Sequence, residues 1–113
     1  MREIVINSDF GGFGLSDDAI RRYFQLINWK CVEEIKYDIT FFYKDTISEE
    51  TYFNEHDLER DDPFLVQIVK ELGDRANGRY SSLKIVEIPD DVMWHLCDYD
   101  GCEHVAEDHR TWK

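Results

Sequence analysis

The stretch DDPFLVQIVKELG, residues 61 to 73, constrains the fold more than any other part of the chain. Asp62 suits the N-cap of a helix, and Pro63 suits the first turn, because a proline at this position removes no intrahelical hydrogen bond. Gly73 provides the stop signal. Apolar residues recur at helical spacing between these signals, at Leu65, Ile68, Val69 and Leu72. The sequence therefore predicts a helix with one apolar face, and that face needs a core to pack against.

Alternation and composition predict the elements around this helix. Residues 2 to 8 alternate Ile4 and Ile6 with other side chains, which is typical of a half-buried strand. A second helix is predicted from Asp17 to Asn28, with Ser16 as its N-cap. Strands are predicted at residues 37 to 44 and 83 to 89, irregular structure or a short helix at residues 46 to 60, and a hairpin from Val92 through the turn signal DYDG to CEHVAED. This order predicts an α+β fold with two main helices, a mostly antiparallel sheet and a C-terminal β-hairpin.

Length and composition limit the class of protein. A chain of 113 residues fits one domain, and 42% hydrophobic and 14% aromatic residues are typical of a folded core. The net charge of -12 disfavours DNA, RNA and membrane surfaces as partners, because such surfaces are themselves anionic. No apolar run is long enough to span a bilayer. The three cysteines are an odd number, which favours free thiols in a reducing cytoplasm.

The stretch SDFGGFGLSDDAI, residues 8 to 20, places three glycines within four positions, between a predicted strand and a predicted helix. Such a loop can bring backbone N–H groups close to a phosphate at the helix N-terminus. It can also be a tight turn with Phe10 or Phe13 packed into the core. The Walker and dinucleotide-binding motifs are both incomplete here, and Asp17 and Asp18 would repel a phosphate. The tight turn is the structure we expect.

The segment HLCDYDGCEH, residues 95 to 104, gathers four potential metal ligands. A turn at residues 98 to 101 would place all four on one face of a hairpin, with Cys97 opposite Cys102 and His95 opposite His104. Structural zinc sites usually use CxxC knuckles instead of flat paired strands. A metal site and a reversible disulfide stay open beside the plainer interpretation, a solvated hairpin face. We expect no metal and no cofactor.

Two segments combine arginine with aromatic or amide side chains: DRANGRY, residues 74 to 80, and HRTW, residues 109 to 112. A guanidinium group can fork onto a phosphate while an aromatic ring stacks on a nucleobase. The alternative is salt bridging on an acidic surface. Catalytic groups are less distinctive, because no nucleophile signature surrounds the cysteines and histidines.

Several phrases of this chain resemble a widespread family of small phage and prophage proteins. These phrases are IVINSDFGGFGLSDDAI, ERDDP, ELGDRANGRYSSLKIVEIPDDV and YDGCEHVAEDHRTW; residues 29 to 53 lie outside the resemblance. The family in turn resembles the Thoeris anti-defence sponges. Those proteins bind and hide the cyclic ADP-ribose signal made by bacterial TIR-domain proteins and, in some members, cyclic oligonucleotides.

The resemblance implies sequestration without catalysis, in a homo-oligomer whose pockets lie at subunit boundaries and are built from Arg and aromatic side chains. Carried onto this chain motif by motif, it implies ligand contacts from Phe13, Arg60, Arg75, Asn77, Arg79, His109, Arg110 and Trp112. The family pattern does not need Cys97 or Cys102. We therefore expect a binding protein for a small cyclic nucleotide in the cytoplasm of a bacterial host. A protein-binding inhibitor of a host factor and a small nucleotide-processing enzyme stay open as alternatives.

Overall fold

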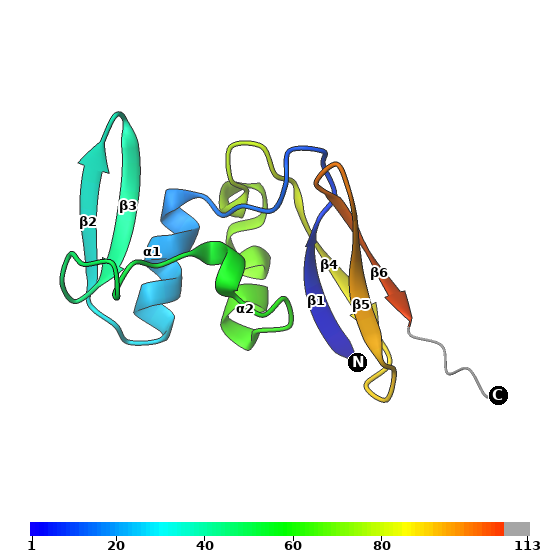
Figure 1. Cartoon of the computed structure of the whole chain (residues 1–113). Coiled ribbons are helices and arrows are strands. Elements are labelled where there is room, and N and C mark those ends of the chain that lie inside the picture. Colours follow the sequence, from blue (N-terminus) through cyan, green and yellow to red (C-terminus); the bar gives the residue numbers. More distant parts are fainter. Residues whose placement is uncertain (108–113) are drawn as a thin grey trace.

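The computed structural model describes residues 1 to 107. Its strands are β1 (Arg2–Asn7), β2 (Cys31–Lys36), β3 (Ile39–Lys44), β4 (Leu83–Ile88), β5 (Trp94–Tyr99) and β6 (Cys102–Glu107). Its helices are α1 (Asp17–Leu26) and α2 (Pro63–Leu72), with short 3₁₀ helices η1 (Glu55–Asp57) and η2 (Gly73–Ala76). The hairpin β2–β3 lies at one end, the two helices in the middle, and the other four strands at the opposite end (Figure 1). This architecture confirms the predicted α+β fold class and the C-terminal hairpin.

The strands pair in three separate two-stranded antiparallel sheets: β1 with β4, β2 with β3, and β5 with β6. The antiparallel pairing was expected, but the sheet is divided. One cause is visible along β1, where the N–H of Val5 donates to the carbonyl oxygen of Arg60 (2.8 Å). An irregular segment thus lies along this edge of β1, and β1 pairs with β4 alone among the strands of residues 1 to 107.

Helix α2 forms as its local signals predict. The carboxylate of Asp62 accepts hydrogen bonds from the N–H groups of Phe64 and Leu65, and Pro63 lies in the first turn. Gly73 ends the helix with a φ of 57°, a conformation that costs glycine little. Helix α1 also begins as predicted, with the Ser16 side chain accepting from the N–H of Ala19, and ends at Leu26, two residues earlier than predicted.

The core lies where the two helices meet β1 and the inner face of the hairpin β2–β3. Leu65 and Ile68 of α2, Phe24 of α1 and Val5 of β1 are at most 1% exposed. The Tyr23 hydroxyl donates to Asp62 (2.8 Å) and so links α1 to the N-cap of α2. Burial raises the pKa of the Tyr23 phenol, and the neighbouring carboxylate adds to the effect.

The predicted strand at residues 37 to 44 is partly wrong. Tyr37 and Asp38 form a two-residue turn with φ values of 53° and 62°, so the strand begins at Ile39. The preceding strand β2 was not predicted, because CVEEIK carries three charges in six residues. Tertiary contacts supply what the local sequence lacks: Glu33 of β2 accepts two hydrogen bonds from the guanidinium of Arg21 (2.8 and 3.1 Å).

The C-terminal hairpin forms, with a register that differs from the predicted one. The turn consists of Asp100 and Gly101, so Cys97 lies opposite His104, while His95 lies opposite Ala106 and Cys102 opposite Tyr99. The predicted opposition of the two cysteines is therefore wrong, because β5 continues two residues further, to Tyr99, than the DYDG signal implied. Cys97 and Cys102 are free thiols.

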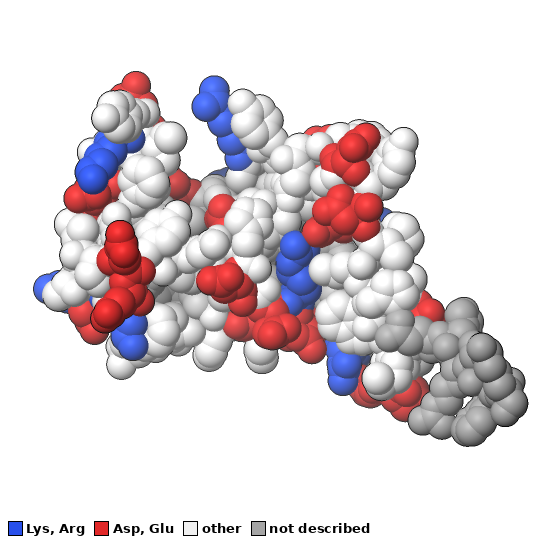
Figure 2. Space-filling model, viewed as in Figure 1, with Lys and Arg blue, Asp and Glu red and all other residues white. Residues whose placement is uncertain are grey.

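The surface mixes charges of both signs. Carboxylates are spread over the face in Figure 2, and the basic side chains are scattered among them instead of gathering in one patch. No helix formed by residues 1 to 107 is long and apolar enough to cross a membrane.

Candidate functional site: a junction of three glycine loops

Three loops that are far apart in the sequence meet at one end of the molecule. They are residues 8 to 15, residues 77 to 82, and the turn Asp100–Gly101; we call this contact the glycine junction. The N–H of Gly78 donates to the carbonyl oxygen of Gly14 (3.1 Å), and the Ser81 hydroxyl donates to the same oxygen (2.8 Å). The junction joins the stretches that carry GGFGLS, ANGRY and YDG, all of which belong to the phrases behind the family resemblance.

Glycine is required at the junction because backbones touch there. A Cβ on Gly11 would overlap the carbonyl group and Cβ of Tyr80, and one on Gly78 would lie 2.8 Å from the carbonyl carbon of Gly14. Gly101 has a φ of 88°, and a Cβ on it would lie 2.5 Å from the backbone nitrogen of Gly12. Each loop thus presents a glycine to a neighbour. The glycines serve close packing between loops, as the tight-turn interpretation expected.

Asn7, at the end of β1, ties the three loops together and is fully buried. Its Nδ2 donates to the carbonyl oxygens of Asp9 and Gly101 (2.7 Å each), and its Oδ1 accepts from the N–H of Ser82 (2.8 Å). Sequence reasoning missed this residue. The available signal was a polar amide at the end of an otherwise buried strand, where an unpaired amide would be costly.

A buried ion pair lies directly beneath the junction. Arg60 forks onto both carboxylate oxygens of Glu103, with Nη2 to Oε2 at 2.9 Å, and the two side chains are only 13% and 6% exposed. Glu103 also accepts the N–H of Asn7 (2.9 Å). The guanidinium carbon of Arg60 lies 3.7 Å from the ring centroid of Phe13. Phe13 is therefore packed in the core as predicted, and Arg60 is engaged within the chain.

The N-terminus of α1 is also engaged within the chain. The N–H of Ser16 donates to the carbonyl oxygen of Ala76 (2.9 Å), and the N–H of Leu15 donates to the carboxylate of Glu55 (3.0 Å). Burial raises the pKa of Glu55, while the Leu15 hydrogen bond opposes this effect. These N–H groups would have formed a phosphate cradle, so the structure favours the tight turn.

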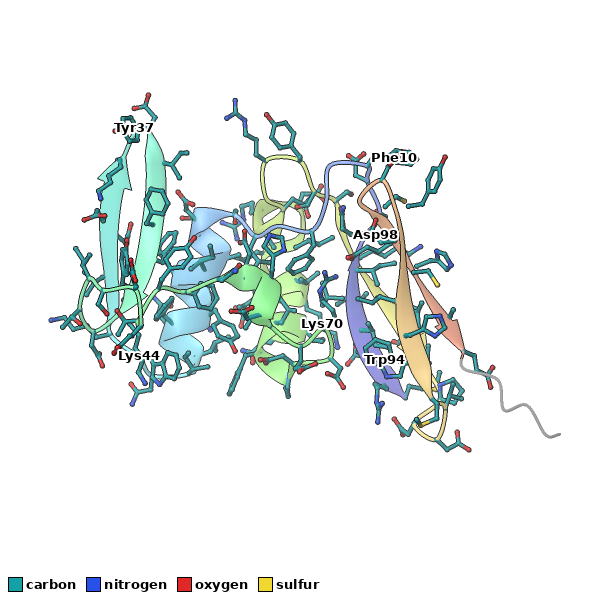
Figure 3. All side chains as sticks on the ribbon, in the orientation of Figure 1. Phe10, Tyr37, Lys44, Lys70, Trp94 and Asp98 are labelled. Carbon is teal, nitrogen blue, oxygen red and sulfur yellow. The ribbon has the colours of Figure 1, made fainter. Side chains whose placement is uncertain are left out.

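The outer surface of the junction carries exposed aromatic rings and one stacked arginine. Phe10, Tyr80 and Tyr99 are 65%, 64% and 72% exposed, one from each loop or its immediate flank. The guanidinium carbon of Arg79 lies 5.5 Å from the ring centroid of Tyr80. Figure 3 shows Phe10 projecting outward beside the end of β5 that carries Asp98. An aromatic surface with a guanidinium group can stack against a nucleobase.

The predicted ligand residues divide into three groups. Phe13 and Arg60 touch each other beneath the junction, and Asn77 is held within it, its Oδ1 accepting from the N–H of Leu83 (2.8 Å). Arg75 and Arg79 are exposed on η2 and on the loop that follows it. His109, Arg110 and Trp112 lie outside the described residues.

Sequence reasoning missed three rings of the outer surface, Phe10, Tyr80 and Tyr99, as ligand candidates. They are exposed large apolar side chains flanking glycines, and this combination was the available signal.

A metal site and a reversible disulfide were the alternatives left open for the C-terminal hairpin. Within residues 1 to 107, no group of three or more His, Cys, Asp and Glu side chains is placed to hold a metal ion. Several hollows lie away from the junction, among them one of about 640 Å³ lined by Arg2, Lys70 and other residues around α2, and one of about 580 Å³ on the hairpin β2–β3. The junction itself is an exposed surface that a partner could cover.

The fold and the junction define a small α+β domain with an arginine-aromatic surface. No protein-family model matches the chain, and no curated protein or solved structure matches it either.

Proposed function

We propose that this protein binds a small cyclic nucleotide signal and sequesters it without cleaving it, as a phage-type anti-defence protein in the cytoplasm of a bacterial host. The ligand is a cyclic ADP-ribose isomer. One observation carries the proposal: the fold joins the backbones of three of the motif stretches behind the family resemblance, Arg79 lies over the ring of Tyr80 on one of them, and Phe10 and Tyr99 are exposed on the other two.

The chemistry of this surface suits a nucleotide. Exposed rings from neighbouring loops offer stacking area for an adenine base, and stacking contributes about 1 to 3 kcal/mol per base. Arg79 can fork onto a phosphate and offset its charge, while dissolved salt screens the ligand from the more distant carboxylates of the acidic chain. Asp9 and Asp98 also lie at the junction, where each accepts a backbone N–H, from Phe10 and from Gly101. Their second oxygens suit ribose hydroxyls, which donate hydrogen bonds to carboxylates.

An exposed surface needs a second wall to hide a ligand. In the proposed homo-oligomer, another copy supplies that wall, and the pocket lies at the subunit boundary. This arrangement agrees with the high exposure of the three rings in the single chain. Surface aromatic residues of this kind are typical of binding sites.

Calorimetric titration with cyclic ADP-ribose isomers tests the proposal. Wild type should bind, and Arg79→Ala should weaken binding roughly ten- to a hundredfold, since a charge-assisted hydrogen bond contributes about 1.5 to 3 kcal/mol. Arg79→Lys should restore part of the affinity, because lysine keeps the charge but not the planar fork. Arg22→Ala is the matched control, because Arg22 is a partly exposed arginine paired with Glu71 on the helices.

Denaturing the complex then distinguishes sequestration from catalysis. Release of intact ligand supports the sponge, whereas release of a product identifies an enzyme. No binding of any cyclic ADP-ribose isomer or cyclic oligonucleotide, or equal affinity in wild type and Arg79→Ala, overturns the proposed site.

A further inference from the structure

The hairpin β2–β3 has one covered edge and one open edge. Along β3, the N–H of Lys44 donates to the carbonyl oxygen of Thr51, and the N–H of Phe53 donates to the carbonyl oxygen of Phe42 (2.9 Å each). The segment at residues 51 to 53 therefore occupies the outer edge of β3. Within residues 1 to 107, β2 pairs with β3 alone, and β2 is the outermost element at its end of the molecule (Figure 1).

The hydrogen-bond pattern shows which groups of β2 face this open edge. The backbone N–H and C=O groups of Phe42 and Lys44 face the covered edge of β3. Because successive residues of a strand direct these groups to opposite edges, the odd-numbered residues of β3 are the ones that hydrogen-bond to β2. Their partners in the register are Val32, Glu34 and Lys36. The remaining residues of β2, with the N–H and C=O groups of Glu33 and Ile35 among them, therefore point away from β3. An extended strand can pair there.

The side chains around this edge are unusually exposed for apolar residues. Ile35 is 73% exposed, Tyr37 95% and Ile39 57%. Figure 3 shows Tyr37 at the tip of the hairpin, away from the rest of the molecule. Open strand edges are normally protected by charged side chains, proline, a bulge, or a covering segment. Within the described residues, the edge of β2 has no proline, bulge or covering segment, and its charges are of both signs, at Glu33, Glu34 and Lys36, so a strand of complementary charge can pair there.

We propose that β2 pairs antiparallel with β2 of a second copy of this chain, with Ile35 opposite Ile35 at the two-fold axis. The charge pattern suits this register, in which Glu34 and Lys36, an ion pair within each chain (3.1 Å), also meet across the axis. Glu34 and Lys36 flank Ile35, so the two-fold axis places each Glu34 opposite Lys36 of the partner subunit. Registers centred on Glu33, Glu34 or Lys36 would place like charges directly opposite each other, which is destabilising.

The pairing joins two hairpins into a continuous four-stranded sheet. Isolated two-stranded hairpins are marginal in water, and four strands are a more stable unit. The two-fold axis is perpendicular to the sheet. The odd-numbered residues of both β2 strands therefore lie on one face of the joined sheet, and the even-numbered residues of both lie on the other. Phe42 and α1 then cover one face of the sheet in both copies. The aromatic group Phe41, Tyr43 and Tyr52, with ring centroids 5.7 and 6.3 Å apart, lies on the other face in both.

This inference goes beyond the proposed function, because the β2 interface is separate from the subunit boundary proposed at the glycine junction. The interface itself needs no nucleotide and lies at the opposite end from the glycine junction (Figure 1). Assembly is therefore measured without ligand, so that a failure of this pairing and a failure of ligand binding can be told apart.

Sedimentation of two charge-reversal variants, alone and mixed, tests the register. Wild type should dimerise at micromolar concentration. Glu34→Lys places lysines opposite each other, Lys36→Glu places glutamates opposite each other, and each variant alone should dimerise roughly tenfold more weakly. An equimolar mixture should form a heterodimer, because the two reversals restore opposite charges across the axis. The control is Lys70→Glu, which reverses the charge of a lysine on α2 that pairs with Glu3 of β1. It should leave dimerisation unchanged.

A cysteine cross-link provides the second measurement. Ile35→Cys should form an intermolecular disulfide under mild oxidation, identified by mass spectrometry as the peptide joined to itself, since opposite residues lie about 5.5 Å apart at Cα. Asp90→Cys, on the exposed segment after β4 and away from the hairpin β2–β3, should not. A wild type that stays monomeric at 100 micromolar, a dimer insensitive to both reversals, or a mixture that behaves like its components overturns the proposal.

Discussion

The two ends of this molecule treat polar and apolar side chains in opposite ways. At the glycine junction, polar groups are enclosed: Asn7 is fully buried, and the Arg60–Glu103 pair is almost so. At the hairpin β2–β3, apolar groups are exposed, with Ile35 and Tyr37 more than two-thirds accessible. Burial of a polar group is tolerated only when its hydrogen bonds are made within the chain. The junction therefore depends on internal partners, whereas the hairpin has apolar surface left for an external one.

The turns of the two hairpins show the same difference. Both are two-residue turns with positive φ at both positions, Tyr37–Asp38 in one and Asp100–Gly101 in the other. Gly101 suits its left-handed conformation and its close approach to Gly12, so the closed end demands glycine. At the open end, a tyrosine and an aspartate occupy the positions that asparagine and glycine usually fill. The open hairpin is less optimised for its own stability.

The largest expected effect comes from breaking the buried ion pair. Arg60→Ala should lower the free energy of unfolding by about 3 to 5 kcal/mol, because Glu103 then remains buried without its counter-charge. Denaturant unfolding measures this change. The double variant Arg60→Met with Glu103→Gln should recover much of the loss, since the glutamine still accepts the N–H of Asn7. Arg22→Ala, which breaks a more exposed forked pair with Glu71, should cost much less. Similar losses for Arg60 and Arg22 would remove the distinction between an enclosed and an open end.

The second effect tests whether backbone contact requires glycine at the junction. Gly11→Ala should destabilise the protein by about 1 to 3 kcal/mol, because the added methyl group meets the backbone of Tyr80. Gly14→Ala is the matched control in the same loop, where the nearest atom to an added Cβ is 3.9 Å away. Thermal melts of both variants provide the comparison. A Gly11→Ala variant as stable as Gly14→Ala contradicts the packing role.

A smaller effect of opposite sign is expected at the open hairpin. Asp38 has a φ of 62°, so Asp38→Gly should relieve the left-handed conformation and raise stability by about 0.4 to 1 kcal/mol. Asp100→Gly makes the same change in the other hairpin, where Asp followed by Gly already suits the turn, and should gain less. Chemical denaturation can resolve the difference. A loss of stability from Asp38→Gly shows that the aspartate has a role beyond the turn.

The smallest effect concerns Glu55, which links the loop at Leu15 to η1. Burial raises its pKa, so its contribution to stability is fully present below the pKa of unfolded glutamate, about 4.3, and is lost as the pH rises through the folded value. Glu55→Gln keeps an oxygen for the N–H of Leu15 and removes the charge. The melting temperature of the variant should exceed that of wild type at pH 7, and the difference should shrink towards pH 4. A difference independent of pH would assign the effect to packing.

The predicted elements were most accurate where short-range signals agree. Helix α2 matches its prediction because its cap, its proline, its apolar face and its stop all lie within one segment. Strand β2 was not predicted, because it carries three charges in six residues; one of them, Glu33, pairs with Arg21 of α1 in the folded chain. The register of the C-terminal hairpin was misplaced by a turn signal that begins two residues before the actual turn.

Three of the motif stretches meet at the glycine junction, while the ligand contacts of their residues stay predictions. The side chains of Phe13 and Arg60 contact each other beneath the junction, and Asn77 accepts a hydrogen bond within it. Arg79 is exposed beside Tyr80, a neighbour that sequence reasoning did not select. Whether an arginine binds a ligand or a carboxylate of its own chain depends on what the fold places next to it, and Glu103 is 43 residues away from Arg60 in the sequence.

The sequence by itself determined the two helices, the α+β class and the close spacing of glycines before α1, because these follow from hydrogen bonds and side-chain periodicity within a few residues. Tertiary structure alone decided the rest. Asn7 contacts Gly101 across 94 residues, and Gly11 meets Tyr80, so the junction forms only when three distant loops pack together. The open edge of β2 likewise arises because the segment at residues 51 to 53 covers β3 and nothing in residues 1 to 107 covers β2. Contacts at such separations depend on the path of the whole chain, which no local pattern encodes.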